Sequence, residues 1–400
     1  AMIVMKRGPM GCVVFPTAIP DDIEKGIKGP GFPVEVYNVL GAGDAFMSGF
    51  LRGWLRDEPI ETCCSYANAG GAFAVSRLLC SAEYATFTEM QHLIQYGSKT
   101  RAVRHDEALT HLHWATTRDA VTSYTKANHI FALAIDHRAQ LEKIADEAGA
   151  PRELIKKFKA LALEATLSVA QGQEGFGMLL DGTYGREALF KATGHNLWIG
   201  RPVEMPGSRP LDFEGGGSLA AKLIEWPVNH IIKCLCFYHP DDSDEMKDKQ
   251  DRELLRVHDA ARKLGRELLI EIICGKNGKL RDNTTASVID HLYQLKIKPD
   301  WWKLEGQPNS HAWVQIEKII KDHDPLCRGI MMLGLDAPED QLIDAFAIAK
   351  PNPLVKGFAI GRTIFGEPAR QWLQNKMSDA EAIDVMAQSF SRLVSAWTKI

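Results

Sequence analysis

A lysine interrupts an apolar, strand-like segment close to residue 303. Residues 300–309 read DWWKLEGQPN, so Lys303 stands between two tryptophans and a leucine. Burying an ammonium group without a partner is costly, and such a group tends to lose its proton instead. A deprotonated lysine is a nucleophile, which makes this segment a candidate site of chemistry.

Two other apolar segments carry a comparable intrusion. Lys233 stands within IIKCLCFY and Glu271 within LLIEIIC. Two lysines and a carboxylate in a water-poor site suit Schiff-base catalysis. Burial and the second cation would favour a neutral Lys303, which attacks a ketone and forms an iminium that stabilises the carbanion left by C–C cleavage. Glu271 would move the protons.

A purely structural interpretation of the same residues stays open. A lysine within a strand often extends to solvent or pairs with a carboxylate. Glu305, Glu271 and Asp136 would then neutralise the two lysines as a buried network. The residue pattern alone does not decide between this network and catalysis.

The elements that position these residues alternate between strand and helix from residue 129 onward. The eight candidate strands are HIFALAIDHR, GFGMLLDGTYG, NLWIGRPVE, NHIIKCLCFYH, ELLIEIIC, DWWKLEG, GIMMLGLD and VKGFAIGRTIF. This alternation predicts an α/β fold, a (β/α)₈ TIM barrel over residues 129–400, with an open doubly wound sheet as the alternative. The ends of barrel strands meet at one mouth, where Asp136 is a candidate catalytic residue and Arg138 and Asp181 are candidate substrate-binding residues.

A different block precedes the barrel. Residues 1–92 contain the strand-like runs MIVMKRG, CVVFP and VEVYNV, followed by the turn GAGD and helical patterns. Residues 93–128 are polar and lack a clear period, and they are interpreted as a connector with some helix. We therefore expect two domains and a connector.

The composition is that of an ordinary globular protein. The 400 residues carry a net charge of −4 and are 45% hydrophobic, which gives no reason to expect nucleic acid or an acidic membrane as partner. No apolar run approaches the roughly 20 residues of a membrane span, and no signal peptide opens the sequence. The eight cysteines show no Cys-x-x-Cys spacing. A reduced, cytoplasmic protein is expected.

The second block resembles the tagatose-1,6-bisphosphate aldolase group of class I barrel aldolases. The segments that carry the likeness are AIDHRAQ, LLDGTYG, IIKCLCFYHPDD, LLIEIIC, WWKLEGQPN and FAIGRTIF. The resemblance implies that Lys303 forms the Schiff base, that Lys233 is a further active-site lysine, and that Glu271 is the acid/base residue. It also matches Asp136 to an active-site residue, and Gly361 and Arg362 to the phosphate site.

One segment departs from this family. The seventh strand ends Leu333-Gly334-Leu335-Asp336, where the family usually has a serine in its phosphate loop. Backbone contacts from Gly334 remain an expectation, but the binding of the phosphorylated end is in question.

The first block resembles the C-terminal part of ribokinase-like sugar kinases. The likeness rests on Gly41, Ala42, Gly43 and Asp44, in which the glycines face a transferring phosphate and the aspartate is the base. A complete kinase would need ATP and Mg²⁺. Asn38-Val39 replaces the family's usual Asp-Thr, and most of the kinase is missing, so we expect this segment to be inactive alone.

The order of the two blocks resembles the bifunctional 5-dehydro-2-deoxygluconokinase/phosphogluconate aldolases of myo-inositol breakdown. The resemblance implies cleavage of 6-phospho-5-dehydro-2-deoxygluconate to dihydroxyacetone phosphate and malonate semialdehyde, without a cofactor. The substrate carboxylate would suit Lys233, Arg138 or Arg201. The partner expected is this small molecule, and the sequence leaves homo-oligomer formation open.

Two alternatives belong to other classes of function. One is a metal-dependent aldolase or epimerase that uses His137, His239 and Asp136, although no three-histidine set stands at ligand spacing. The other is a non-catalytic barrel that scaffolds or regulates the kinase.

Overall fold

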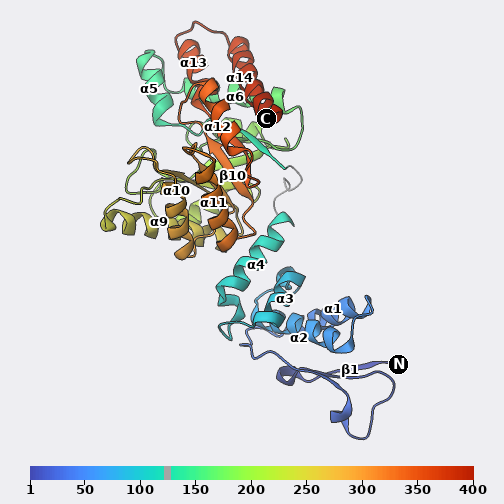
Figure 1. Ribbon diagram of the computed structural model, residues 1–400. Coiled ribbons are helices and arrows are strands. Elements are labelled where there is room, and N and C mark those ends of the chain that lie inside the picture. Colours follow the sequence, from blue (N-terminus) through green and yellow to red (C-terminus); the bar gives the residue numbers. More distant parts are fainter. Residues whose placement is uncertain (121–127) are drawn as a thin grey trace. The chain divides into compact units, whose positions relative to one another are not determined.

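The computed structural model describes residues 1–120 and 128–400 (Figure 1). The chain divides after Arg118 into two units, residues 1–118 and 119–400. The division therefore lies within the predicted connector 93–128. Helix α4 (Glu107–Thr117), which falls in that stretch, belongs to the first unit, and residues 121–127 lie outside the described residues.

The first unit joins a small antiparallel sheet to four helices. The strands, in sheet order, are β1 (Ile3–Lys6), β2 (Cys12–Phe15) and β3 (Ile27–Gly29). The longer helices are α1 (Ala42–Trp54), α2 (Ile60–Ser76), α3 (Phe87–Tyr96) and α4. Apolar side chains of β2, α1 and α2, among them Val14, Phe50 and Ala67, form one core. The predicted strands MIVMKRG and CVVFP are confirmed, and helix α1, which begins within the turn GAGD, and helix α2 form where the sequence shows helical patterns.

The predicted strand VEVYNV is wrong. Residues 34–39 form no strand. The backbone N–H of Glu35 donates to the carbonyl of Arg101, and those of Tyr37 and Asn38 both donate to the carbonyl of Val75. The alternation of apolar side chains is present, but among the described residues no neighbouring strand offers a ladder of hydrogen bonds. Without that ladder the extended segment is a loop.

The second unit is the predicted barrel. Its strands all pair in parallel and close in the order β10-β11-β4-β5-β6-β7-β8-β9. Their bounds are β4 (Ile130–Ala134), β5 (Phe176–Leu179), β6 (Trp198–Pro202), β7 (Ile231–Phe237), β8 (Leu268–Ile273), β9 (Trp301–Leu304), β10 (Gly329–Leu333) and β11 (Val355–Ile360). Each falls within one of the eight predicted segments, and the sheet is closed rather than open.

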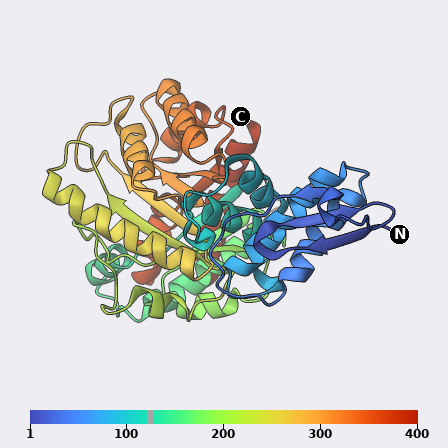
Figure 2. The ribbon, with the colours of Figure 1, turned by 90° about the horizontal axis from the view of Figure 1, so that it is seen from below.

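Helices cover the outside of this barrel (Figures 1 and 2). They are α5 (Ala139–Glu147), α6 (Leu154–Ala170), α7 (Arg186–Lys191), α8 (Leu219–Leu223), α9 (Asp244–Lys263), α10 (Thr284–Gln294), α11 (Ser310–His323), α12 (Glu339–Ala349), α13 (Arg362–Leu373) and α14 (Asp379–Lys399). In the described part of the chain, no helix combines the length and apolarity that crossing a bilayer requires.

An apolar layer fills the barrel below the buried charges. Trp301, Ile231 and Leu269 lie in this inner cluster. Each stands two residues before a charged side chain on the same strand, and alternation puts both members of each pair on the inward face. The charged groups therefore lie directly above an apolar layer, which keeps water away from the side that faces the barrel interior.

Candidate active site

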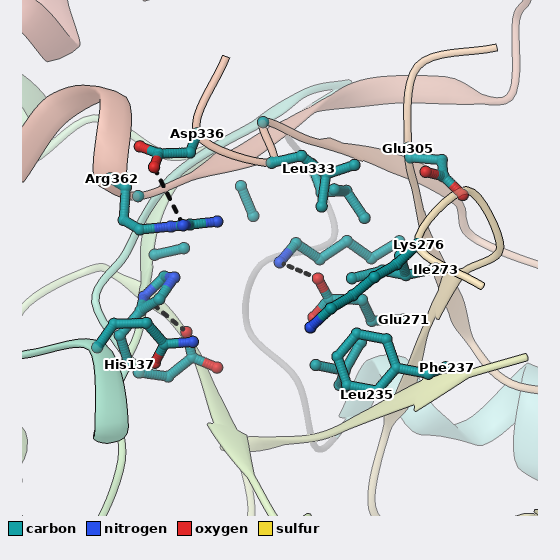
Figure 3. Close-up of a pocket in the computed structure, with 18 of the residues that line it drawn as sticks. His137, Leu235, Phe237, Glu271, Ile273, Lys276, Glu305, Leu333, Asp336 and Arg362 are labelled. Carbon is teal, nitrogen blue, oxygen red and sulfur yellow. Dashed lines mark hydrogen bonds and ion pairs between the residues drawn. The ribbon is translucent and has the colours of Figure 1, made fainter. Parts of the chain in front are cut away.

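A cavity of about 610 Å³ opens at the carboxyl ends of the barrel strands. The charged and glycine residues that line it include Asp136, Arg138, Glu204, Lys233, Glu271, Lys276, Lys303, Glu305, Gly334, Asp336, Gly361 and Arg362. The cavity thus brings together eight of the residues predicted from the sequence: Lys303, Glu271, Lys233, Asp136, Gly361, Arg362, Gly334 and Arg138. Figure 3 shows Arg362 and His137 on one side of it, with Glu271 and Lys276 on the other.

Lys303 and Glu271 form the centre of the site. The two residues are register partners on adjacent strands β9 and β8, so their side chains leave the sheet side by side. The Lys303 Nζ lies 2.9 Å from Glu271 Oε1, and both side chains are buried. A proton can pass directly between them over this distance.

Lys233 is surrounded by three carboxylates. Its Nζ lies 3.0 Å from Asp136, 2.8 Å from Glu204 and 3.0 Å from the second oxygen of Glu271. Burial disfavours its ammonium form, but the three carboxylates outweigh burial and hold the pKa of Lys233 well above its ordinary value. Lys233 therefore stays charged, and Glu271 joins it to Lys303.

The same charges act on the carboxylates. Burial alone would raise the pKa of Glu271 and of Asp136, but the neighbouring lysines outweigh it and lower both pKa values. Glu271 is therefore held as a carboxylate between two amines. Its ionised form can accept a proton, and the lowered pKa makes it a weaker base than an ordinary glutamate.

Glu204 is a site residue that the sequence analysis missed. It follows β6, is buried, and also accepts a hydrogen bond from the backbone N–H of Leu235 at 3.2 Å. Burial raises its pKa, against the opposing pull of Lys233 and Arg138. The sequence could have indicated this residue, because Glu204 is the last residue of the predicted strand NLWIGRPVE, and Asp136 likewise lies near the end of HIFALAIDHR.

Arg362 begins helix α13 and points into the cavity. Gly361 precedes it where a side chain would clash, since an added Cβ would lie 2.2 Å from the carbonyl oxygen of Ala134. The Arg362 guanidinium is not free, because it lies 3.1 Å from the carboxylate of Asp336. Asp336 therefore occupies the partner position that a phosphate would need.

The Asp336 carboxylate comes from a turn with unusual backbone geometry. Leu335 and Asp336 have φ values of 48° and 67°, in the left-handed region that few non-glycine residues adopt. The turn directly follows Gly334 after β10. This is the segment that departs from the aldolase family, and here it presents an acid to Arg362.

Asp181 is not among the residues lining the cavity. Its carboxylate forms a fully buried ion pair with Lys159 of α6 and accepts hydrogen bonds from the backbone N–H groups of Thr183 and Tyr184. Lys159 also donates to the carbonyls of Ile135 and His137, at 2.7 and 2.8 Å. The pair thus ties the ends of β4 and β5 together behind Asp136. The expected direct role of Asp181 at the substrate gains no support from its position.

Two further residues predicted for the site do not line the cavity: Arg201, expected to bind the substrate carboxylate, and His239, a metal ligand in the alternative hypothesis. Arg201 lies 4.0 Å from the ring centre of Trp226. Among the described residues, no three His, Cys, Asp or Glu side chains converge as metal ligands would.

The glycine turn of the first unit starts helix α1. Gly41 is the N-cap, with a φ of 77° that favours glycine, and Asp44 is exposed in the first helical turn. Ala42 and Gly43 lie between them. The turn therefore starts a helix as predicted, but the strand predicted before it, VEVYNV, is a loop.

Two family models match consecutive parts of the chain. Residues 89–400 match the family described as "Uncharacterized protein conserved in bacteria (DUF2090)". The chain belongs to this family. Residues 1–86 match the pfkB family of carbohydrate kinases. The DUF2090 match thus contains the whole barrel and its cavity, and the glycine turn lies in the kinase match.

Curated relatives match only small parts of the chain. The 5-dehydro-2-deoxygluconokinase of Geobacillus kaustophilus is 25% identical over 103 residues, which is 26% of this chain and 29% of that protein. The ATP-dependent ribose-1-phosphate kinase of Halopiger xanaduensis is 48% identical over 48 residues, 12% of this chain and 16% of that protein. The chain spans less than a third of either relative.

A solved aldolase shares the barrel fold. The fructose-bisphosphate aldolase of Plasmodium falciparum aligns with a TM-score of 0.54 and 14% identity, over 72% of this chain and 95% of that one. At this identity the likeness describes the fold alone. The predicted TIM barrel preceded by a partial kinase segment is confirmed.

Proposed function

We propose that the DUF2090 barrel is a class I aldolase that cleaves a phosphorylated keto sugar acid through a Schiff base on Lys303. The observation that carries this proposal is the contact of Lys303 with Glu271, whose other oxygen binds the ammonium group of Lys233. A nucleophile, a proton acceptor and a fixed cation share one water-poor site, which is the set that amine catalysis of carbon–carbon cleavage requires.

The proposed reaction begins with proton transfer from Lys303 to Glu271. The neutral amine attacks the ketone carbon, and the carbinolamine loses water with the proton that Glu271 took up, which gives an iminium and returns Glu271 to a carboxylate. That carboxylate removes the proton of the hydroxyl on the β-carbon, at the far end of the scissile bond. The bond breaks, an aldehyde leaves, and the electron pair enters the iminium to form an enamine. The protonated Glu271 gives its proton to the enamine carbon, and hydrolysis of the resulting iminium releases the ketone product and regenerates the amine of Lys303.

Lys233 contributes by keeping its charge throughout this sequence. Its three carboxylate partners hold it in place next to Glu271. A fixed positive charge beside the reacting atoms stabilises the alkoxide that forms before cleavage. All the steps of the proposal use side chains of the barrel.

For the substrate we propose 6-phospho-5-dehydro-2-deoxygluconate, cleaved between C3 and C4 to malonate semialdehyde and dihydroxyacetone phosphate. The kinase match in residues 1–86, and a relative named 5-dehydro-2-deoxygluconokinase, support a place in sugar-phosphate metabolism. In this proposal the ketone at C5 reacts with Lys303. The neighbouring phosphate binds Arg362 after it displaces the carboxylate of Asp336.

The kinase segment enters the proposal only as part of a larger activity. Gly41, Gly43 and Asp44 lie at the start of helix α1, where the transferring phosphate would bind in this proposal. Because the chain spans less than a third of the kinases that it matches, we propose that phosphotransfer with ATP and Mg²⁺ requires further kinase elements.

Borohydride trapping tests the aldolase proposal. Incubation with the phosphorylated keto acid and borohydride should leave a covalent adduct on the peptide that contains Lys303, and an aldehyde and triose phosphate should appear without borohydride. Lys303→Arg should abolish both results, whereas Lys279→Arg, an exposed lysine outside the cavity, should retain them. An adduct at another lysine, or cleavage by Lys303→Arg, would contradict the proposal.

A further inference from the structure

The cations that line the cavity differ in whether they are available to a ligand. Four of them have a carboxylate partner: Arg138 with Glu214, Lys233 with Asp136, Lys303 with Glu271, and Arg362 with Asp336. An anionic ligand at any of these must first displace a protein carboxylate. This disfavours Lys233 and Arg138, two of the residues expected to bind a substrate carboxylate.

Lys276 is the exception among the described residues that line the cavity. It follows β8 and forms no ion pair in the part of the chain that the structure describes. Its Nζ lies 4.4 Å from the ring centre of Phe237, an attraction worth about 0.5–1 kcal/mol at an exposed site. A carboxylate can therefore bind this ammonium without breaking an ion pair.

The backbone before Lys276 is held by Glu305. A single oxygen of this buried carboxylate accepts hydrogen bonds from the N–H groups of Cys274 and Gly275, at 2.7 and 2.8 Å. A side chain at position 275 would displace this carboxylate, because an added Cβ would lie 2.8 Å from the other oxygen of Glu305. Glu305 stands two residues after Lys303, so the strand that carries the proposed nucleophile also fixes the base of the Lys276 loop.

Lys276 and Arg362 reach the cavity from opposite sides (Figure 3). Arg362 comes from β11 and α13, and Lys276 from the loop after β8, with the pair of Lys303 and Glu271 also lining the cavity. A substrate with two anionic ends and a ketone between them would match this arrangement of charges.

We propose that Lys276 binds the carboxylate of the keto acid, at the end remote from Arg362, and that Glu305 is the residue that positions it. The choice of a carboxylate rests on the proposed function. The assignment of an anion to Lys276 depends only on the cavity and its charges. Lys276 thereby sets the preference for a phosphorylated keto acid over a ketose phosphate that has no carboxylate.

A kinetic comparison tests this role. Lys276→Met should raise KM for the phosphorylated keto acid about tenfold, the usual loss for one hydrogen bond to a charged group, with kcat near the wild-type value. The primary amide of the same acid should show no difference between the two proteins. Lys279→Met, an exposed lysine of the same loop that does not line the cavity, is the matched control. An unchanged KM for the acid, or an equal rise for the amide, would overturn the proposal.

A binding measurement separates this proposal from the aldolase reaction. Malonate, titrated by calorimetry, should bind wild type and Lys279→Met alike and Lys276→Met about tenfold more weakly. That result would stand even if no borohydride adduct formed on Lys303. Equal malonate affinity in all three proteins would overturn the assignment of Lys276, whatever the fate of the Schiff base.

The affinity for malonate also tests whether Glu305 positions Lys276. Glu305→Gln retains a carbonyl acceptor for the two N–H groups and should keep the wild-type affinity for malonate. Glu305→Ala should lose the same factor as Lys276→Met, and the double variant should lose no more than either single one. Additive losses would show that Glu305 acts independently of Lys276 and would overturn its assigned role.

Discussion

The side-chain nitrogen of Lys303 lies 2.9 Å from an oxygen of Glu271, its register partner on the neighbouring strand. The contact is built into the sheet, because two adjacent parallel strands present these residues at the same height. A slip of one residue in either strand would turn one side chain out of the barrel. The pairing of strands thus defines the proposed catalytic pair before any loop contributes.

The first prediction concerns the proton acceptor. Glu271→Gln keeps the shape of the side chain but removes the base, so we expect kcat to fall by about 10²- to 10⁴-fold. Lys303 should still be trapped by borohydride after longer incubation, because the amine remains. Glu204→Gln is the comparison and should lose less, because the Glu204 carboxylate pairs with Lys233, whereas Lys303 pairs with Glu271. Cleavage at the wild-type rate by Glu271→Gln would rule out its assigned role.

The second prediction concerns the cation that the carboxylates share. Lys233→Met leaves Asp136, Glu204 and Glu271 close together without their central charge. Removal of one partner from a buried ion pair costs about 3–5 kcal/mol, so urea unfolding at pH 7 should show a loss of this order. The loss should shrink at pH 5, where the crowded carboxylates can take up protons.

The control for this loss is an exposed lysine. Lys156→Met removes a surface ammonium of α6 and should change the free energy of unfolding by less than about 0.5 kcal/mol. If Lys233→Met were no less stable than this control at pH 7, the three carboxylates would not depend on Lys233.

Much of the barrel could be predicted from the sequence because its strands are short apolar runs with charges at defined positions. Lys303, Glu271 and Asp136 stand out as ionisable residues in or just after such runs. The alternation of side chains along a strand then predicts that the first two face inward.

Contacts between elements distant in sequence could not be predicted in the same way. The partner of Asp181 is Lys159, which lies on a helix and resembles any lysine of an amphipathic pattern. The difference between Arg362 and Lys276 depends on one carboxylate, Asp336, whose side chain is aimed by left-handed backbone angles at a turn. The wrong prediction at VEVYNV has a related cause. Alternation of apolar side chains is typical of a strand, but it does not show whether a second strand lies alongside to pair with it.

The third prediction concerns the phosphate end. Asp336→Asn removes the charge that pairs with Arg362, and asparagine tolerates the left-handed backbone at this position. Because the pair is partly exposed and worth about 1 kcal/mol or less, we expect inorganic phosphate to bind up to about fivefold more tightly. Calorimetric titration measures this, with Asp340→Asn on α12 as an exposed control. Unchanged or weaker phosphate binding would show that Asp336 does not compete for Arg362.

The last prediction concerns His137, whose ring lines the cavity beside Arg362. Burial is the largest influence, and together with the charges of Lys303 and Arg362 it outweighs Asp136 and lowers the pKa of His137 from 6.5 to about 4. Between these two values the unfolded chain binds more protons than the folded one. The free energy of unfolding should therefore fall as the pH drops from 6.5 to 4, by at most about 3 kcal/mol from this residue, and should be fully retained above pH 6.5.

Two measurements check the pH dependence. The ring protons of His137 should titrate near pH 4 in an NMR experiment, and Arg362→Met should move that midpoint upward because it removes a repelling charge. Urea unfolding of His137→Gln should show a shallower loss of stability between pH 6.5 and 4 than wild type does. A ring that titrates near 6.5, with or without Arg362, would mean that the cavity neither buries His137 nor brings it under the field of the two cations.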